Sequence, residues 1–232
     1  MPPADEQHLR RDICRICRMM YARGLIEGPA GNVSARAGPD RILLTPSMLF
    51  KQRLRPEQLL AVGSQGERLG PESDASRDLR TTSELAMHLE VYRRRPDVGS
   101  VVHAHPPHCV ALSIAGQPLQ PALLTEGVGF LGAVPTALYG TPGTTEMSKA
   151  ISDLIQDHDA VVLPYHGSLT VGRDVWEAYA RLEVLEKLAQ VQCLVQQLGG
   201  GSSLPAHEIE KLIAMRRRQV AGGAERDEPP SA

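Results

Sequence analysis

The chain has 232 residues, 42% of them hydrophobic and 22% charged, which suits one globular domain and argues against wholesale disorder. With 25 basic and 27 acidic side chains the formal net charge is −2, so there is no basic excess for nucleic acid or an anionic membrane. No apolar run approaches the ~20 residues that span a bilayer, and the charged start lacks the apolar stretch of a secretion signal, so we expect a cytoplasmic protein.

Predicted elements in the first half of the chain alternate between helices and strands. Leu9, Ile13, Ile16 and Met20 form one apolar stripe, which predicts a helix from Asp5 to Arg23. After it we expect a Gly-rich polar loop, a strand that stops at a proline, short paired strands, a polar loop and a second helix: Gly28–Arg36, Arg41–Thr45, residues 60–70, Pro71–Arg80 and Ser83–Arg94.

The second half continues this alternation. Gly99–His105 is predicted as a strand because Val101 and Val102 are β-branched. Further on we expect a helix, a second helix, an apolar strand, a long helix and a last helix: Pro106–Ile114, Thr144–Ile155, Ala160–Pro164, Asp174–Leu198 and Ala206–Gln219. Residues 221–232 have the composition of a disordered tail. The pattern predicts one domain, residues 1–220, of the α/β or α+β class.

Cys14 and Cys17 form a C-x-x-C pattern, which occurs in redox sites and in half-sites for zinc. They lie in the first predicted helix, and no second C-x-x-C follows. We therefore interpret them as small core residues.

Three histidines follow or end predicted strands. His103 and His105 are two residues apart on a strand, so both imidazoles point to one face. Taken alone, this pair is equally consistent with a metal platform and with two partly buried histidines bonded to the backbone. His166 comes directly after a second strand and before Gly167, which permits a tight turn and the close approach of a ligand. Three histidines from two strand ends favour a catalytic divalent-metal site, most simply Zn²⁺, with its fourth position open.

Polar residues begin the second predicted helix, at Thr81–Glu84. Hydroxyl groups and free backbone N–H groups at a helix N-terminus can bind an anion, although locally ordinary helix capping is the better explanation of these residues. A carboxylate such as Glu84 near a Lewis-acid metal suits proton transfer beside a carbonyl. The loops Gly28–Arg36 and Thr45–Ser47 can be plain turns, and they carry no nucleotide-binding fingerprint.

Several segments occur together in a characteristic order: GNVSAR, LLTPS, TTSELAMH, RPDVGSVVHAHPPHCVALS, YGTPGTTE and HGSLTVGRDVWEAYARLEVLE. In this combination the chain resembles the class II aldolase/adducin family over roughly residues 6–200. The resemblance implies a three-layer α/β/α sandwich around a mostly antiparallel mixed sheet. It also implies a homotetramer with active sites at the subunit interfaces.

The same resemblance implies roles for individual residues. His103, His105 and His166 match the zinc ligands, and Glu84 matches the acid/base glutamate that also touches the metal in the resting site. The residues matching positions that cradle the substrate phosphate are Asn32, Ser47, Thr82 and Ser83.

The activity implied is metal-dependent cleavage of an L-fuculose-phosphate-like ketose 1-phosphate to dihydroxyacetone phosphate and a short aldehyde, through a metal-stabilised enediolate. Dehydration or decarboxylation of a related sugar phosphate is the alternative on the same fold. Epimerisation fits less well, because the family's epimerases carry aspartate where Glu84 stands. An adducin-like scaffold without chemistry would have lost the metal histidines, and all three are present here.

The chain departs from the aldolase pattern at three positions. Met48 replaces a glycine of the phosphate loop, Leu124 lies near the place of an interface tyrosine, and no tyrosine follows Tyr179. Glu126 is a candidate replacement polar group, with an ordinary surface role as the alternative. We interpret His108 as a structural residue or one that supports a ligand. The other histidines, His8, His88, His158 and His207, belong to no constellation and receive no role.

Overall fold

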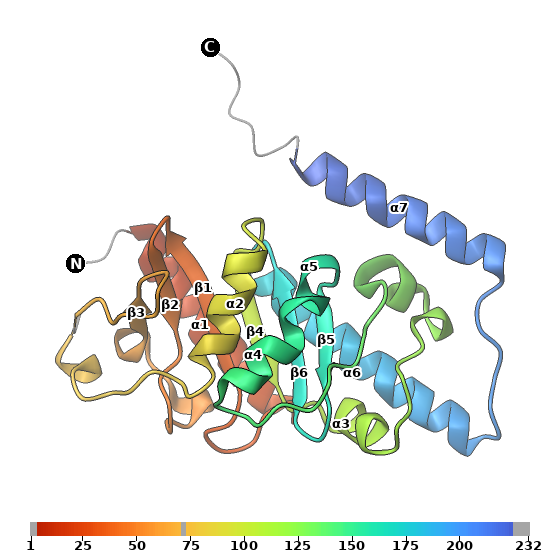
Figure 1. The fold of residues 1–232 in the computed structure, drawn as a ribbon, viewed down its shortest axis with the longest axis horizontal. Helices are drawn as coiled ribbons and strands as arrows, with labels where there is room; N and C mark the ends of the chain where they lie inside the picture. The colour runs from red at the N-terminus through yellow and green to blue at the C-terminus, as the bar shows by residue number, and fades with distance from the viewer. Residues whose placement is uncertain (1–3, 71–72, 225–232) are drawn as a thin grey trace, which may run out of the picture.

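An antiparallel sheet forms the centre of the computed structural model, which describes residues 4–70 and 73–224 (Figure 1). Its six strands lie in the order β3-β2-β1-β4-β6-β5, and every neighbouring pair is antiparallel. The strands are β1 (Asn32–Gly38), β2 (Arg41–Leu44), β3 (Leu60–Val62), β4 (Ser100–Ala104), β5 (Ala160–Leu163) and β6 (Gly167–Gly172). An isolated bridge between Thr136 and Val162 adds a parallel pairing at the β5 edge, so the expected mostly antiparallel mixed sheet is confirmed.

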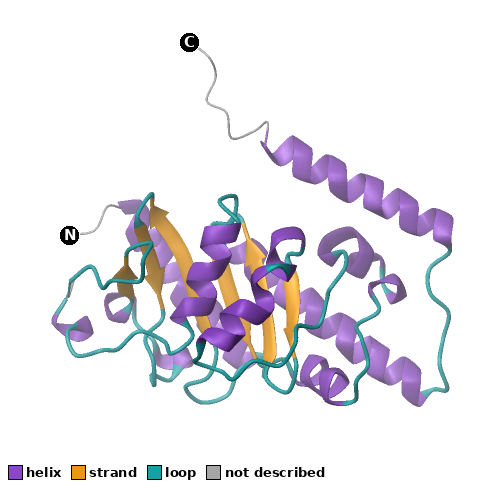
Figure 2. Ribbon diagram, viewed as in Figure 1, coloured by secondary structure: helices purple, strands orange, loops and turns teal. Residues whose placement is uncertain are grey.

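Helices cover both faces of this sheet (Figure 2). They are α1 (Ala4–Ala22), α2 (Leu85–Arg94), α3 (Pro107–Ile114), α4 (Thr145–Ser152), α5 (Leu154–Asp157), α6 (Val175–Gln197) and α7 (Ala206–Ala224). α1 and α6 lie on one face, whereas α2, α4 and α5 lie on the other, which gives the three layers that the family resemblance implies. α7 stands apart from the layers and contacts the π-helical turn η5 (Gly127–Leu131).

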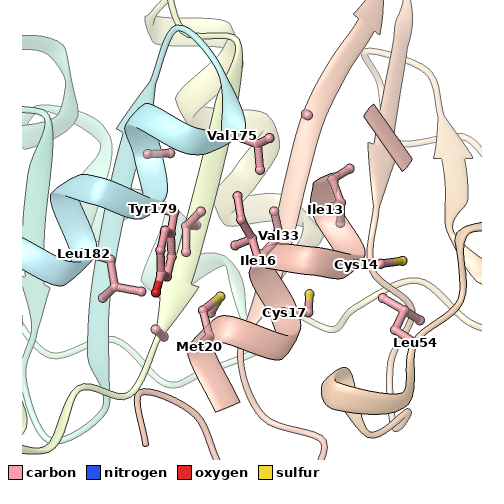
Figure 3. Packing of buried hydrophobic residues seen from close by; sticks show 14 of the residues in the cluster. Ile13, Cys14, Ile16, Cys17, Met20, Val33, Leu54, Val175, Tyr179 and Leu182 are labelled. Atoms are coloured by element: carbon pink, nitrogen blue, oxygen red, sulfur yellow. The ribbon is translucent and has the colours of Figure 1, made fainter. Parts of the chain in front are cut away.

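The core is aliphatic, as the scarcity of aromatic residues in the sequence requires. One cluster, which includes Ile13, Val33 and Leu182, fills the space between α1, α6 and β1 (Figure 3). Cys14 and Cys17 lie in this cluster, and burial raises the pKa of each thiol to about 12. The interpretation of the C-x-x-C pair as core residues is therefore confirmed.

Several sequence predictions need correction. The segment predicted as a Gly-rich loop, Gly28–Arg36, contains most of β1, because β2 and β4 pair with it on both sides. β6 and η5 were not predicted at all. The helix predicted over Thr144–Ile155 is two, α4 and α5.

The predicted termini of helices hold to within a few residues, with one larger difference at the end of the chain. α7 runs to Ala224, four residues into the stretch 221–232 that the sequence predicts to be a disordered tail. Residues 225–232 lie outside the described residues. Among the helices that the structure describes, none is long and apolar enough to cross a membrane.

Candidate active site

Three imidazoles meet where β4 ends and β6 begins. His103 is the fourth residue of β4, His105 follows its last residue, and His166 precedes the first residue of β6. Because Ala104 pairs with Ser168 across the antiparallel ladder, these two strand ends lie side by side. The ring centroids are 4.8–5.1 Å apart, and one nitrogen from each ring lies within 4.8 Å of the others. The structure thus brings together the three histidines predicted as ligands.

The turn that carries His166 depends on two unusual backbone positions. Tyr165 has φ +60°, a left-handed conformation that costs a non-glycine residue free energy. A Cβ on Gly167 would lie 2.1 Å from the carbonyl oxygen of Ala104, so only glycine lets β6 approach β4 here. We expected this glycine to admit a ligand, whereas it admits the neighbouring strand.

The hydrogen bonds of His103 and His105 set their tautomers. His103 Nδ1 lies 2.9 Å from the carbonyl oxygen of Ser168, and His105 Nδ1 lies 3.0 Å from Glu27 Oε1. Both partners only accept hydrogen bonds, so each Nδ1 carries the hydrogen and each Nε2 presents a lone pair.

The two Nε2 atoms lie 3.2 Å apart. Tetrahedral zinc with Zn–N bonds of ~2.05 Å separates its ligand atoms by about 3.3 Å. His166 Nδ1 and Glu84 Oε1 are buried without a hydrogen-bond partner among the described residues. Converging lone pairs and unpaired buried polar atoms are the donor set that a small divalent cation satisfies, so these residues fit the expected metal.

Glu84 lies at the same point. Its side chain is 9% exposed, with Oε2 3.2 Å from His103 Nε2 and Oε1 3.6 Å from His166 Nε2. Burial alone would raise the pKa of Glu84, but His103, the Asn32 amide, His166 and His88 together hold it below its ordinary value. Burial also lowers the pKa of His103 to about 3 and lowers that of His166. The site therefore presents a carboxylate and neutral imidazoles, the forms in which these groups bind metals.

The residues expected to hold the phosphate surround the start of α2. Pro46 forms a β-bridge with Thr81, and the Ser47 N–H donates to the Arg80 carbonyl at 2.9 Å, so the loop after β2 lies beside the segment before α2. The Thr82 hydroxyl accepts from the Glu84 N–H at 3.3 Å, and the exposed Ser83 follows it. α2 begins at Leu85 rather than at the predicted Ser83.

Asn32 opens β1, opposite His103. Its amide nitrogen donates to Glu84 Oε2 at 2.8 Å, and its oxygen faces His88 Nε2. The amide nitrogen carries a second hydrogen, so one donor is left for the phosphate expected there. Met48 has φ +58° and a 77% exposed side chain, so it occupies a conformation that suits the glycine it replaces.

A cavity of about 490 Å³ opens beside the histidines. α3 supplies an apolar wall that includes Val110 and Ile114, while Glu27 and Tyr165 supply polar groups. Neither polar residue was predicted, because each lies in a loop with no periodic pattern. No local pattern in the sequence marks Glu27 or Tyr165 as part of the site.

Two other candidates lie elsewhere. His108 Nδ1 is hydrogen-bonded to Glu186 at 2.7 Å, and the same carboxylate accepts hydrogen bonds from the backbone N–H groups of His108 and Cys109. His108 therefore has a structural role, in which it helps to join the first turn of α3 to Glu186. Glu126 lines a separate hollow with Phe130 and Arg216. Within one subunit, Glu126 does not line the cavity at the histidines.

Comparison with known proteins decides the family. Residues 11–193 match the family model described as Class II Aldolase and Adducin N-terminal domain. The chain belongs to the class II aldolase/adducin family. It is 30% identical over 229 residues to the 5-methylthioribulose-1-phosphate/5-deoxyribulose-1-phosphate aldolase of Rhodospirillum rubrum, covering 99% of this chain and 100% of that relative.

Solved structures of class II aldolases agree with this assignment. An L-fuculose-1-phosphate aldolase from Thermus thermophilus is 32% identical, with a TM-score of 0.69 over 84% of this chain and 98% of that one. A second L-fuculose 1-phosphate aldolase, at 23% identity, shares the fold with a TM-score of 0.82 over 94% of this chain and 98% of its own. The protein is accordingly an aldehyde-lyase with the fold of metal-dependent class II aldolases.

Proposed function

We propose that this class II aldolase cleaves a small ketose 1-phosphate to dihydroxyacetone phosphate and a short aldehyde, with Zn²⁺ as its metal. The observation that carries the proposal is the position of Glu84, whose two carboxylate oxygens lie 3.2 and 3.6 Å from two of the three converging histidines. A carboxylate at this place can move a proton on a substrate carbon that lies beside the three histidines.

His103, His105 and His166 would hold the cation. When bound, a divalent cation supplies the positive charge that stabilises the electron pair released by carbon–carbon cleavage. The neighbouring loops position the substrate: Ser47, Thr82, Ser83 and the second amide hydrogen of Asn32 would hold its phosphate.

Two protons move in the reaction. The C4 hydroxyl loses its hydrogen as the C4=O double bond forms and the C3–C4 bond breaks, and C3 then gains a hydrogen. In the reverse direction the ionised Glu84 carboxylate removes that hydrogen from dihydroxyacetone phosphate, so by microscopic reversibility it returns it during cleavage. Tyr165 and Glu27 line the cavity beside the histidines. Because Glu27 is already hydrogen-bonded to His105, we assign the transfer of the C4 hydroxyl proton to the Tyr165 phenol.

The substrate end away from the phosphate would lie against α3. Pro107, Val110, Ala111 and Ile114 make this wall of the cavity apolar. A wall without hydrogen-bond donors favours a sugar that ends in a methyl or methylthio group over one that ends in a hydroxyl. The substrate named for the Rhodospirillum rubrum relative has such an end, which supports a deoxy- or methylthio-ketose 1-phosphate.

Activity on a matched set of sugars tests this proposal. Zinc-loaded protein is incubated with 5-deoxyribulose 1-phosphate, fuculose 1-phosphate, ribulose 1-phosphate and unphosphorylated 5-deoxyribulose, and dihydroxyacetone phosphate is measured with a coupled dehydrogenase. We expect cleavage of the deoxy esters, weaker cleavage of ribulose 1-phosphate and least of the free sugar. Loss of water or of carbon dioxide without any dihydroxyacetone phosphate would assign a dehydratase or decarboxylase instead. The homotetramer and the cytoplasmic location stay predictions.

A further inference from the structure

Behind Glu84 lies a continuous chain of buried polar side chains. Asn32 Oδ1 faces His88 Nε2, His88 Nδ1 lies 2.7 Å from Ser34 Oγ, and Ser34 Oγ lies 2.8 Å from the Tyr92 hydroxyl. All four side chains are at least 95% buried. Polar groups this deep cost free energy unless each finds a partner, and here every one does.

Two simple spacings in the sequence produce this series of hydrogen-bonded side chains. Asn32 and Ser34 are two residues apart on β1, so both point to one face of the sheet. Glu84, which directly precedes α2, lies four residues before His88, and Tyr92 lies four residues after it, so the three side chains lie along one face of the helix. α2 lies over this part of the sheet (Figure 1), and hydrogen bonds join the two rows of side chains.

Hydrogen-bond chemistry gives this chain one direction. The Glu84 carboxylate only accepts, so Asn32 must turn its NH₂ group toward it and its oxygen toward His88. That oxygen also accepts, so His88 carries its hydrogen on Nε2 and receives the Ser34 hydroxyl hydrogen at Nδ1. The Ser34 oxygen in turn accepts from the Tyr92 hydroxyl. Burial, which lowers the pKa of His88 to about 4, keeps its ring neutral as this order requires.

The surroundings hold the far end of the chain in place. The Ser34 carbonyl accepts a hydrogen bond from the Ser100 hydroxyl at 2.7 Å, which joins β1 to the first residue of β4. The Arg36 guanidinium lies 4.6 Å from the centre of the Tyr92 ring and donates to the Tyr92 carbonyl at 2.8 Å. The Asn32 amide that donates to Glu84 is therefore held by a fixed series of hydrogen bonds through His88, Ser34 and Tyr92.

We infer that His88 is a positioning residue for the carboxylate of Glu84: it fixes the Asn32 amide so that the NH₂ group, and not the oxygen, meets Glu84. The inference rests on the proposed proton transfer by Glu84. With His88 replaced by leucine, the buried Asn32 oxygen loses its donor, so the amide is no longer held in the position from which its NH₂ group meets Glu84. A misplacement of about 1 Å at a reacting group can cost on the order of 100-fold in rate.

The test uses the exchange of a carbon-bound hydrogen of dihydroxyacetone phosphate with D₂O, which needs Glu84 but no aldehyde. We expect His88→Leu to slow exchange and cleavage by ~10–100-fold with KM changed less than ~3-fold and with wild-type metal content. His88→Gln, which keeps one donor and one acceptor, should recover a large part of the rate. Val91→Ala is the matched control, because Val91 is a buried residue of α2 that takes no part in these hydrogen bonds. This variant should lower the melting temperature without slowing exchange.

A second readout does not depend on activity. Nitrogen NMR of histidine-labelled protein should show His88 as the neutral Nε2–H tautomer, and Ser34→Ala should shift its Nδ1 resonance. The Nδ1–H tautomer, or exchange at the wild-type rate in folded, metal-loaded His88→Leu, would overturn the inference alone. Absence of exchange in the wild type would overturn the proposed function and this inference with it.

Discussion

Glu84→Gln separates proton transfer from structure, because the substitution changes one atom in a site whose contacts are known. The Oε2 atom must remain an acceptor for the Asn32 amide at 2.8 Å, so the glutamine oxygen takes that place. The new NH₂ group then occupies the position of Oε1, which has no hydrogen-bond partner in the described structure and lies 3.6 Å from His166 Nε2. The side chain is nearly isosteric and the change breaks no hydrogen bond of Oε1 in the described structure, so we expect the free energy of unfolding to change by less than ~1 kcal/mol.

Turnover should respond very differently. A glutamine side chain cannot take up or return a proton near neutral pH, and a positioned acid or base contributes about 10²–10⁴-fold. The barrier should therefore rise by roughly 3–5 kcal/mol, and turnover should fall at least ~100-fold. The assay is formation of dihydroxyacetone phosphate, with metal content and a thermal melt measured on the same preparation. Turnover within about threefold of the wild type, in a folded and metal-loaded variant, would remove Glu84 from the mechanism.

Four further predictions concern the pocket, stability and assembly. Met48→Gly relieves the left-handed backbone and exposes an N–H group, so the KM for the ketose 1-phosphate should fall ~10-fold or more. The KM for the unphosphorylated sugar should not change, and an unchanged KM for the phosphate ester would contradict this. Tyr165→Phe should slow cleavage ~10–100-fold but leave hydrogen exchange of dihydroxyacetone phosphate intact, and equal loss of both would refute its assignment. Because the pKa of His88 falls from 6.5 to about 4 on folding, the unfolded chain binds the proton first, and His88 alone should lower the stability by about 3 kcal/mol from pH 7 to pH 4, in addition to the losses from His103 and His166. A urea series in which His88→Leu shows the same pH slope as the wild type would count against this. Light scattering at micromolar concentration should report a homotetramer, and a monomer would contradict the family expectation.

The metal histidines could be predicted because their signal is local. His103 and His105 share a strand face by simple alternation, and β-branched neighbours mark the strand. His166 is marked by the apolar strand before it and the glycine after it. A two-residue period and a strand end are enough to place such side chains without knowledge of the rest of the fold.

The supporting residues could not be predicted in the same way. β1 is rich in small and polar residues and becomes a strand because β2 and β4 pair with it, a tertiary effect that outweighs local preference. Glu27 is 74% exposed and gains its role only through a contact with His105, 78 residues away. His88 received no role because its partner Asn32 is 56 residues distant, although its four-residue spacing from Glu84 was visible. Such contacts depend on the packing of α2 against the sheet rather than on any local pattern.

We propose that three histidines hold one divalent cation on which aldol cleavage depends. The most direct measurement is a titration of metal-free protein with Zn²⁺, in which bound metal and the rate of dihydroxyacetone phosphate formation from 5-deoxyribulose 1-phosphate are followed together. We expect the rate to rise from near zero in proportion to bound zinc and to level off at about one ion per subunit. Full activity in protein shown to be metal-free, or saturation without any gain in rate, would contradict it.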